Sequence, residues 1–303
     1  MIDRLAAYWA SKKQMSSKIW RWLSILLTIA MIVYLTYAFT RGKLRLDQFN
    51  WKTYGWTILV VLWIYLFLLI IQFFIWSRII SFHRKADIQD VAIYSRTILM
   101  RSLPGGAWHW VGRISMYSDE TQVPTRVVVV GNFLEWVLVI LSGIGIFFMT
   151  LPSQALGFSM AALVFGASIV LGMTWRLAAR NWIARVAEGG LWVALDGLAW
   201  LLNGVIFFLI VQAVAGRGQL SGVEALRAWS FTGSLGVLVS MFPSSLGVRE
   251  ISLVWLLQAK LSSSIVLLIA LMLRLIYMLG DVIWGVIGWL ISSLILRNRN
   301  KTN

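Results

Sequence analysis

Cysteine is absent from the 303-residue sequence, and histidine occurs only twice, as His83 and His109. Without cysteine the chain cannot form disulfides or a thiolate zinc site, and two histidines exclude a histidine-rich metal centre. Acidic residues are also few, 12 against 27 basic residues, and they form neither an aspartate-rich Mg²⁺ motif nor a Ser-His-Asp arrangement. No P-loop is present. We therefore expect no metal, no cofactor and no direct use of ATP.

Apolar sequence is abundant instead: 59% of the residues are hydrophobic and the mean hydropathy is +0.80. Several apolar runs reach the roughly 18 to 20 residues that a helix needs to cross a bilayer. They predict an all-α, polytopic helical membrane protein with about 6–8 spans. The first run is too long for a cleavable signal peptide. The runs lie near 20–39, 55–77, 126–150, 156–175, 191–214 and 265–296.

The last of these runs has two features of its own. Ser262-Ser263-Ser264 is typical of a helix start, because serine hydroxyls accept hydrogen bonds from the free N–H groups there. Gly280 and Asp281 then interrupt the apolar sequence. We expect a kink or a break in the helix at these two residues.

The formal net charge of +15 has no soluble domain to carry it, so nucleic acid is not an expected partner. Short loops that are rich in basic residues stay on the cytoplasmic side of the membrane. Basic clusters before the first run, after the second and fourth, and at the C-terminus fall on one side if both termini are cytoplasmic, and the loop at 41–52 is the exception. We predict a multi-pass protein of the cell inner (cytoplasmic) membrane that contacts anionic lipid headgroups.

Two stretches interrupt the apolar sequence, at 101–113 and 241–250, and each combines proline, small residues and arginine. A helix broken in lipid frees N–H and C=O groups, which is tolerated only inside protein or beside water. The surrounding segments, 88–122 and 228–260, begin and end on the same side of the membrane. We therefore expect two re-entrant helical hairpins with the proline-containing stretches at their tips.

The two hairpins have opposite predicted orientations, and each lies between two spans. This is the arrangement of inverted repeats in many secondary transporters. We expect one integral membrane domain over 1–303, which an inverted repeat would divide into halves at 1–150 and 151–303.

Ionisable residues at membrane depth are the best pointers to a site, because each costs several kcal/mol if unpaired. Backbone N–H groups at a hairpin tip favour anions, and arginine can bind a phosphate through two parallel hydrogen bonds. The alternative is that arginine holds the tip by donating to backbone carbonyls. The substrate-binding candidates are Arg101, Pro104, Gly105, Gly106, Arg113, Pro243, Gly247, Arg249, Glu250 and Arg274.

Three acidic residues are candidates for ion pairs or proton coupling: Glu135, Asp196 and Asp281. Arg113 with Glu250, and Arg249 with Glu135, are two candidate cross-hairpin ion pairs, and the sequence does not choose between these arrangements. The alternative for Glu135 and Asp196 is that they only pair with an arginine and fix helix packing, and for Asp281 that it marks a helix break. Helix glycines are expected to allow close packing rather than to form a site: Gly143, Gly145, Gly166, Gly204 and Gly236.

A resemblance to a known family is carried by three stretches: Arg101-Ser-Leu-Pro-Gly-Gly-Ala-Trp with Gly112-Arg113, Phe242-Pro243-Ser-Ser-Leu-Gly247-Val-Arg249-Glu250, and Leu273-Arg274-Leu-Ile-Tyr277. They resemble the lysylphosphatidylglycerol synthase transmembrane region family, the flippase-like domain of multiple peptide resistance factors, in its stand-alone form. The resemblance extends from roughly residue 20 to 296. Ser244-Ser245 replaces the family's usual glycine in the second stretch, which implies a less flexible tip.

The resemblance implies a protein that moves lipid between leaflets. The full synthases also carry a soluble aminoacyltransferase domain, but this sequence ends at Asn303, just after its last run, so we expect no such enzyme activity. The leading hypothesis is a flippase or transporter for an anionic phospholipid or a lipid-linked precursor. The alternative is a non-catalytic accessory protein for a cell-envelope or lipid-linked glycosyltransferase. A membrane-embedded transferase has little support, because catalytic acidic or histidine clusters are not evident.

Overall fold

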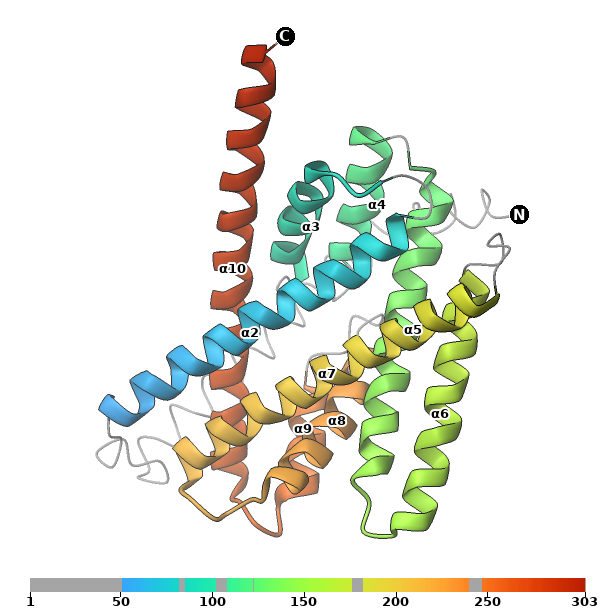
Figure 1. The fold of residues 1–303 in the computed structure, drawn as a ribbon. Helices are drawn as coiled ribbons and strands as arrows, with labels where there is room; N and C mark the ends of the chain where they lie inside the picture. Colours follow the sequence, from blue (N-terminus) through green and yellow to red (C-terminus); the bar gives the residue numbers. More distant parts are fainter. Residues whose placement is uncertain are drawn as a thin grey trace, which may run out of the picture.

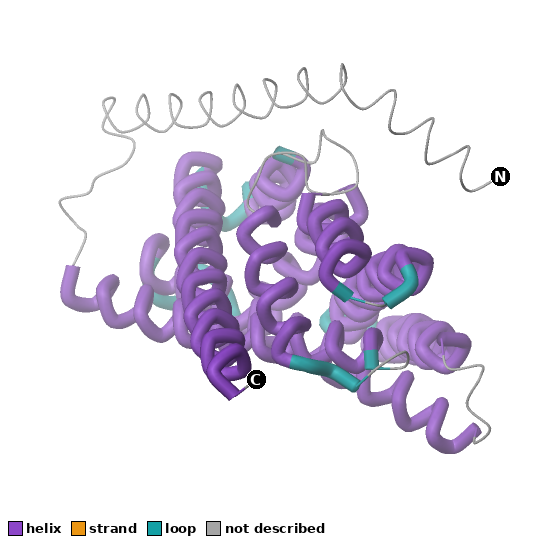
Figure 2. The backbone as a smooth tube through the Cα atoms, turned by 90° about the horizontal axis from the view of Figure 1, so that it is seen from above, coloured by secondary structure: helices purple, strands orange, loops and turns teal. Residues whose placement is uncertain are grey.

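The computed structural model describes residues 51–81, 85–101, 108–121, 123–175, 182–239 and 247–302. The first expected span, 20–39, lies outside these residues, as do the candidates Pro104, Gly105, Gly106 and Pro243. Within the described ranges all regular structure is α-helical, which confirms the all-α class (Figures 1 and 2). The helices are α2 (Trp51–Ile80), α3 (Ile88–Arg101), α4 (Trp108–Glu120), α5 (Thr125–Met149), α6 (Gln154–Trp175), α7 (Trp182–Ala215), α8 (Gly222–Val239), α9 (Val248–Leu257) and α10 (Ser263–Thr302).

Five of these helices are long and apolar enough to cross a membrane, so the multi-pass prediction holds at this level. Each lies on an expected apolar run. Their outward side chains are large and apolar, as with Trp63 at 73% exposure and Leu163 at 67%. Such a surface suits contact with lipid, whereas a water-soluble monomer rarely exposes so much contiguous apolar area. The candidate spans are Tyr54–Ile80, Thr125–Met149, Gln154–Thr174, Val186–Ala215 and Ser263–Ile291.

Shorter helices occupy the two segments where hairpins are expected. α3 packs against α4, and α8 packs against α9, with each break falling outside the described residues. α3 and α4 lie toward the end of the molecule where α10 finishes, and α8 and α9 toward the end where it begins (Figure 1). Gly247 precedes α9 with φ at +96°, a left-handed conformation that glycine adopts without steric cost. The paired helices therefore stand where the hairpins were predicted, at opposite ends of the bundle.

The last helix runs without interruption from Ser263 to Thr302, so the break that was one expectation at Gly280 and Asp281 is wrong. A Cβ atom on Gly280 would lie 2.3 Å from the ring of Tyr65. The glycine therefore admits a neighbouring ring instead of ending the helix. Close to the predicted start, the Ser262 hydroxyl accepts a hydrogen bond from the N–H of Ile265 at 3.4 Å.

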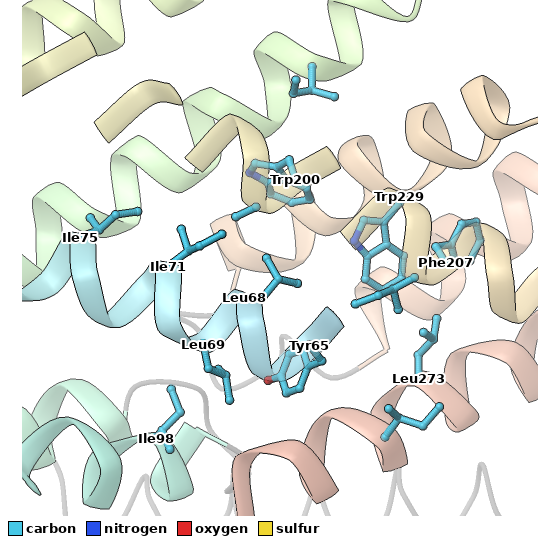
Figure 3. Packing of buried hydrophobic residues seen from close by; sticks show 14 of the residues in the cluster. Tyr65, Leu68, Leu69, Ile71, Ile75, Ile98, Trp200, Phe207, Trp229 and Leu273 are labelled. Atoms are coloured by element: carbon cyan, nitrogen blue, oxygen red, sulfur yellow. The ribbon is translucent and has the colours of Figure 1, made fainter. Parts of the chain in front are cut away.

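The core draws on α2, α3, α4, α5, α7, α8, α9 and α10, and Figure 3 shows the part of it around α2, α7, α8 and α10. Glycine permits several of these approaches: a Cβ on Gly143 would lie 2.6 Å from Trp200, and one on Gly204 would lie 2.4 Å from Leu226. Gly166 is different, because nothing lies within 4 Å of a Cβ placed there. Close packing therefore explains most of the described helix glycines, but not Gly55, Gly166, Gly190, Gly197 or Gly222.

Candidate functional site

The end of α3 is held to α10 and α2 by a polar cluster around Asp281. Arg101 donates from Nη2 to Asp281 Oδ1 at 3.0 Å, and the hydroxyl of Tyr65 donates to the same oxygen at 2.7 Å. Arg101 also donates to Gln72 Oε1 at 3.1 Å and to the Tyr65 hydroxyl. The Asp281 carboxylate is almost fully buried, so Arg101 neutralises a charge that would otherwise be costly.

Aromatic rings connect this cluster to the other side of the bundle. The rings of Tyr65 and Tyr277 are stacked with centroids 4.4 Å apart, and the Tyr277 hydroxyl donates to Asn203 Oδ1 at 2.9 Å. Trp229 of α8 meets Tyr277 edge to face at 6.2 Å. Tyr65 and Trp229 point into the same part of the core in Figure 3. Three helices thus contribute one continuous aromatic group near the polar cluster.

Arg249, at the start of α9, lies against this aromatic group. Its guanidinium carbon is 3.9 Å from the Trp229 ring centroid and 6.0 Å from that of Tyr277. The Nε atom is buried without a hydrogen-bond partner. Glu250 acts on Arg249 through its charge, but across the described part of the chain no carboxylate forms an ion pair with Arg249. The rings of Trp229 and Tyr277 are therefore its direct partners.

A second arginine without an ion pair lies near the first. Arg274 of α10 repels Arg249 electrostatically, which places the two positive charges in the same region. Arg274 is half-buried, and within the described ranges no acidic side chain lies within ion-pair distance of it. We refer to Arg249 and Arg274 as the arginine pair. Among the described side chains, Glu250 partly offsets the charge of Arg249, and no acidic side chain forms an ion pair with either arginine.

Arg113 belongs to a separate cluster between α4 and α5. Its Nη1 atom donates to Glu135 Oε2 at 2.6 Å and to Asn132 Oδ1 at 3.2 Å, while its guanidinium lies 4.1 Å from the Trp76 ring centroid. The candidate pairs of Arg113 with Glu250 and of Arg249 with Glu135 are therefore not the ones formed. The reason is that α4 packs directly on α5, which places Arg113 next to Glu135, whereas α4 and α9 are not in contact.

Asp196, in the middle of α7, differs from the other buried carboxylates. It is 3% exposed, and its Oδ2 atom is buried without a hydrogen-bond partner. Glu135 is a charged neighbour and has the same sign. The structure therefore places two acidic groups near each other, and one of them already has an arginine partner.

The structure thus distributes the sequence candidates over three places. Arg101 and Asp281 form one cluster, Arg249 and Arg274 the arginine pair, and Arg113 and Glu135 a third cluster beside Asp196. Sequence reasoning missed several uncharged members: Tyr65, Gln72, Asn203 and Trp229. Tyrosine and tryptophan are common in membrane helices, so nothing in their spacing marked them. No group of three or more acidic or histidine side chains that could hold a metal ion occurs among the residues the structure describes.

Comparison with known proteins identifies no relative: no family model, no curated protein and no solved structure matches the chain. The resemblance to the lysylphosphatidylglycerol synthase transmembrane region family thus depends on the three short stretches alone and stays a prediction.

Proposed function

We propose that the protein is an integral membrane transporter that moves an anionic lipid between leaflets, with the headgroup bound at the arginine pair. The observation that carries the proposal is that neither Arg249 nor Arg274 forms an ion pair in the described part of the molecule, although Glu250 acts on Arg249 through its charge. Two like charges in a region of low dielectric are unfavourable unless an anion offsets them. A phosphate group supplies that charge and accepts hydrogen bonds from guanidinium groups.

The surroundings of the arginine pair suit a lipid better than a water-soluble anion. Leu275 and Met278, close to Arg274 on α10, are exposed apolar side chains in a candidate membrane span. A headgroup at Arg274 would therefore leave its acyl chains against an apolar surface. The aromatic rings beside Arg249 hold its guanidinium without neutralising it, since a cation–π contact leaves the positive charge in place.

The same proposal includes the topology expected from the sequence. α3 with α4 and α8 with α9 would enter the bilayer from opposite sides as re-entrant hairpins and form an inverted repeat around the site. Both termini would be cytoplasmic, in the cell inner membrane. The two halves would then move relative to each other, so that the arginine pair is exposed first to one leaflet and then to the other. This is what is expected of a stand-alone flippase-like protein.

Leaflet exchange in liposomes tests the function. Purified protein is reconstituted with fluorescent anionic, zwitterionic or polyprenyl phosphate lipids, and the fraction accessible to an external quencher is followed over time. We expect exchange of a phosphate-bearing anionic lipid, slowed about tenfold or more by Arg249→Gln, because hydrogen bonds to charged groups contribute roughly 1.5–3 kcal/mol. Arg274→Gln should slow it similarly.

Arg96→Gln is the matched control, because Arg96 is a half-exposed arginine whose carboxylate partner, Glu120, lies at the surface. It should exchange lipid as the unsubstituted protein does. The arginine-pair site would be contradicted if Arg249→Gln and the unsubstituted protein exchanged lipid at the same rate, and each exchanged anionic and zwitterionic lipids equally well. Absence of exchange for every lipid, with the protein folded, would favour the accessory role.

A further inference from the structure

Four acidic side chains lie within the candidate membrane spans of the described chain, and three of them have a basic partner. Glu188 accepts from Arg78 at 2.5 Å, and Glu135 and Asp281 pair with Arg113 and Arg101 as described above. The fourth is Asp196, for which no basic group within the described residues is close enough to form an ion pair. It is also among the most deeply buried of the four.

The immediate surroundings of Asp196 offer little to stabilise a negative charge. Trp192 and Trp200, one turn to either side on α7, are buried and donate their ring N–H groups elsewhere, to Glu188 and to the backbone carbonyl of Val139. The Oδ2 atom of Asp196 accepts nothing. A carboxylate in such a site costs several kcal/mol, and the usual result is that the group becomes neutral.

Charged groups on the helices around α7 do not change this balance. From α5, Glu135 adds a second negative charge, which Arg113 of α4 already neutralises. The segment Gln154–Thr174 of α6 has no ionisable side chain. The charged residues of α2, α8 and α10 that could face α7 are engaged with other groups or belong to the arginine pair: Arg78, Glu224, Arg227, Arg274 and Asp281.

We propose that Asp196 is a proton-binding site, and that its proton is released and rebound during lipid transport. Glu135 acts on Asp196 through its charge, and Arg113 neutralises Glu135, so the three side chains are together electrically neutral when Asp196 Oδ2 carries one proton. Losing that proton leaves two negative charges beside one positive charge. Release therefore adds negative charge next to the contact between α4 and α5, where Arg113 holds Glu135.

A consequence is that lipid movement by this protein is driven by a proton gradient. This part rests on the proposed function, whereas proton binding at Asp196 does not. Asp281 is a weaker candidate for the same role, because Arg101 and Tyr65 already satisfy its carboxylate.

Infrared spectroscopy of the full protein in lipid nanodiscs tests the proton itself. A protonated carboxyl group absorbs at a higher C=O frequency than a carboxylate. We expect a carboxylic acid band at neutral pH that carries the isotope shift of labelled aspartate, is lost in Asp196→Asn, and persists in Asp119→Asn, which changes an exposed aspartate. Asp196→Glu should keep a band, at a shifted frequency, and it provides a second variant if Asp196→Asn does not fold.

Absence of the band from the unsubstituted protein overturns the proton site. So does a band that Asp196→Asn, folded by size-exclusion chromatography, still shows. Replacing K⁺ by Na⁺ should leave the band unchanged, and its disappearance would mean that Asp196 binds sodium rather than a proton.

A pH difference across the liposome membrane tests the coupling. The unsubstituted protein should accumulate labelled lipid in one leaflet, whereas Asp196→Asn should exchange lipid to an even distribution whatever the gradient. If the unsubstituted protein exchanges lipid to the same distribution with and without the pH difference, the proposed coupling is overturned. Absence of exchange for all lipids contradicts the proposed function instead, and the infrared band still decides whether Asp196 binds a proton.

Discussion

The ion pair between Arg113 and Glu135 allows a quantitative prediction, because it is buried and has an exposed counterpart of the same length. The side chains of Arg113 and Glu135 are 3% and 16% exposed, and those of Arg96 and Glu120 are 38% and 33% exposed. Both pairs have an N–O distance of 2.6 Å. The two ion pairs therefore have the same N–O distance and differ in burial.

Removing one partner of a buried pair costs about 3–5 kcal/mol, because the remaining charge stays buried without compensation. In Glu135→Gln, Arg113 keeps its hydrogen bond to Asn132 and its contact with the Trp76 ring, so we expect a loss of about 3 kcal/mol. Arg113→Met should cost a similar amount. The double variant removes both charges, so its loss should be well below the sum of the two single losses.

Unfolding in mixed micelles, titrated with sodium dodecyl sulfate, gives these free energies from the fluorescence of the 18 tryptophans. Arg96→Met and Glu120→Gln are the controls and should each cost less than about 1 kcal/mol, as expected of exposed pairs. If the Arg113→Met and Glu135→Gln losses simply add in the double variant, the two groups are not coupled and the reasoning from burial is refuted.

Three further predictions concern stability. Gly143→Ala should cost about 1–3 kcal/mol, since its Cβ would lie 2.6 Å from a tryptophan ring, whereas Gly166→Ala, with open space there, should cost nothing in the same titration. Gly247→Ala should destabilise the start of α9 by roughly 1–2 kcal/mol because φ is +96° there; an unchanged midpoint would contradict this. Hydrogen bonds from Lys260 and from the backbone lower the pKa of Glu224 to about 2, so its stabilising effect is complete above its ordinary pKa of 4.5 and disappears as the pH falls toward 2. Melting temperatures measured across that window should show a smaller pH dependence for Glu224→Gln.

The membrane helices could be predicted from the sequence because their signal is local. An apolar run of about 20 residues must form its backbone hydrogen bonds internally in lipid, so composition and length suffice to predict a helix. The positions of the helix pairs α3–α4 and α8–α9 were also predicted, since proline and glycine disfavour a continuous helix. At Gly280 the same rule gave the wrong result, because the close approach of Tyr65, not a break, accounts for that glycine.

The partners of the charged residues could not be predicted from the sequence. It showed which ionisable residues lie in apolar surroundings, because that depends only on their neighbours along the chain. Which carboxylate meets which guanidinium depends on which helices cross and at what height. Only the packing of α4 on α5 assigns Glu135 to Arg113, and only the approach of α3 to α10 assigns Asp281 to Arg101. Among the residues that the structure describes, neither Arg249 nor Asp196 then has an ion-pair partner.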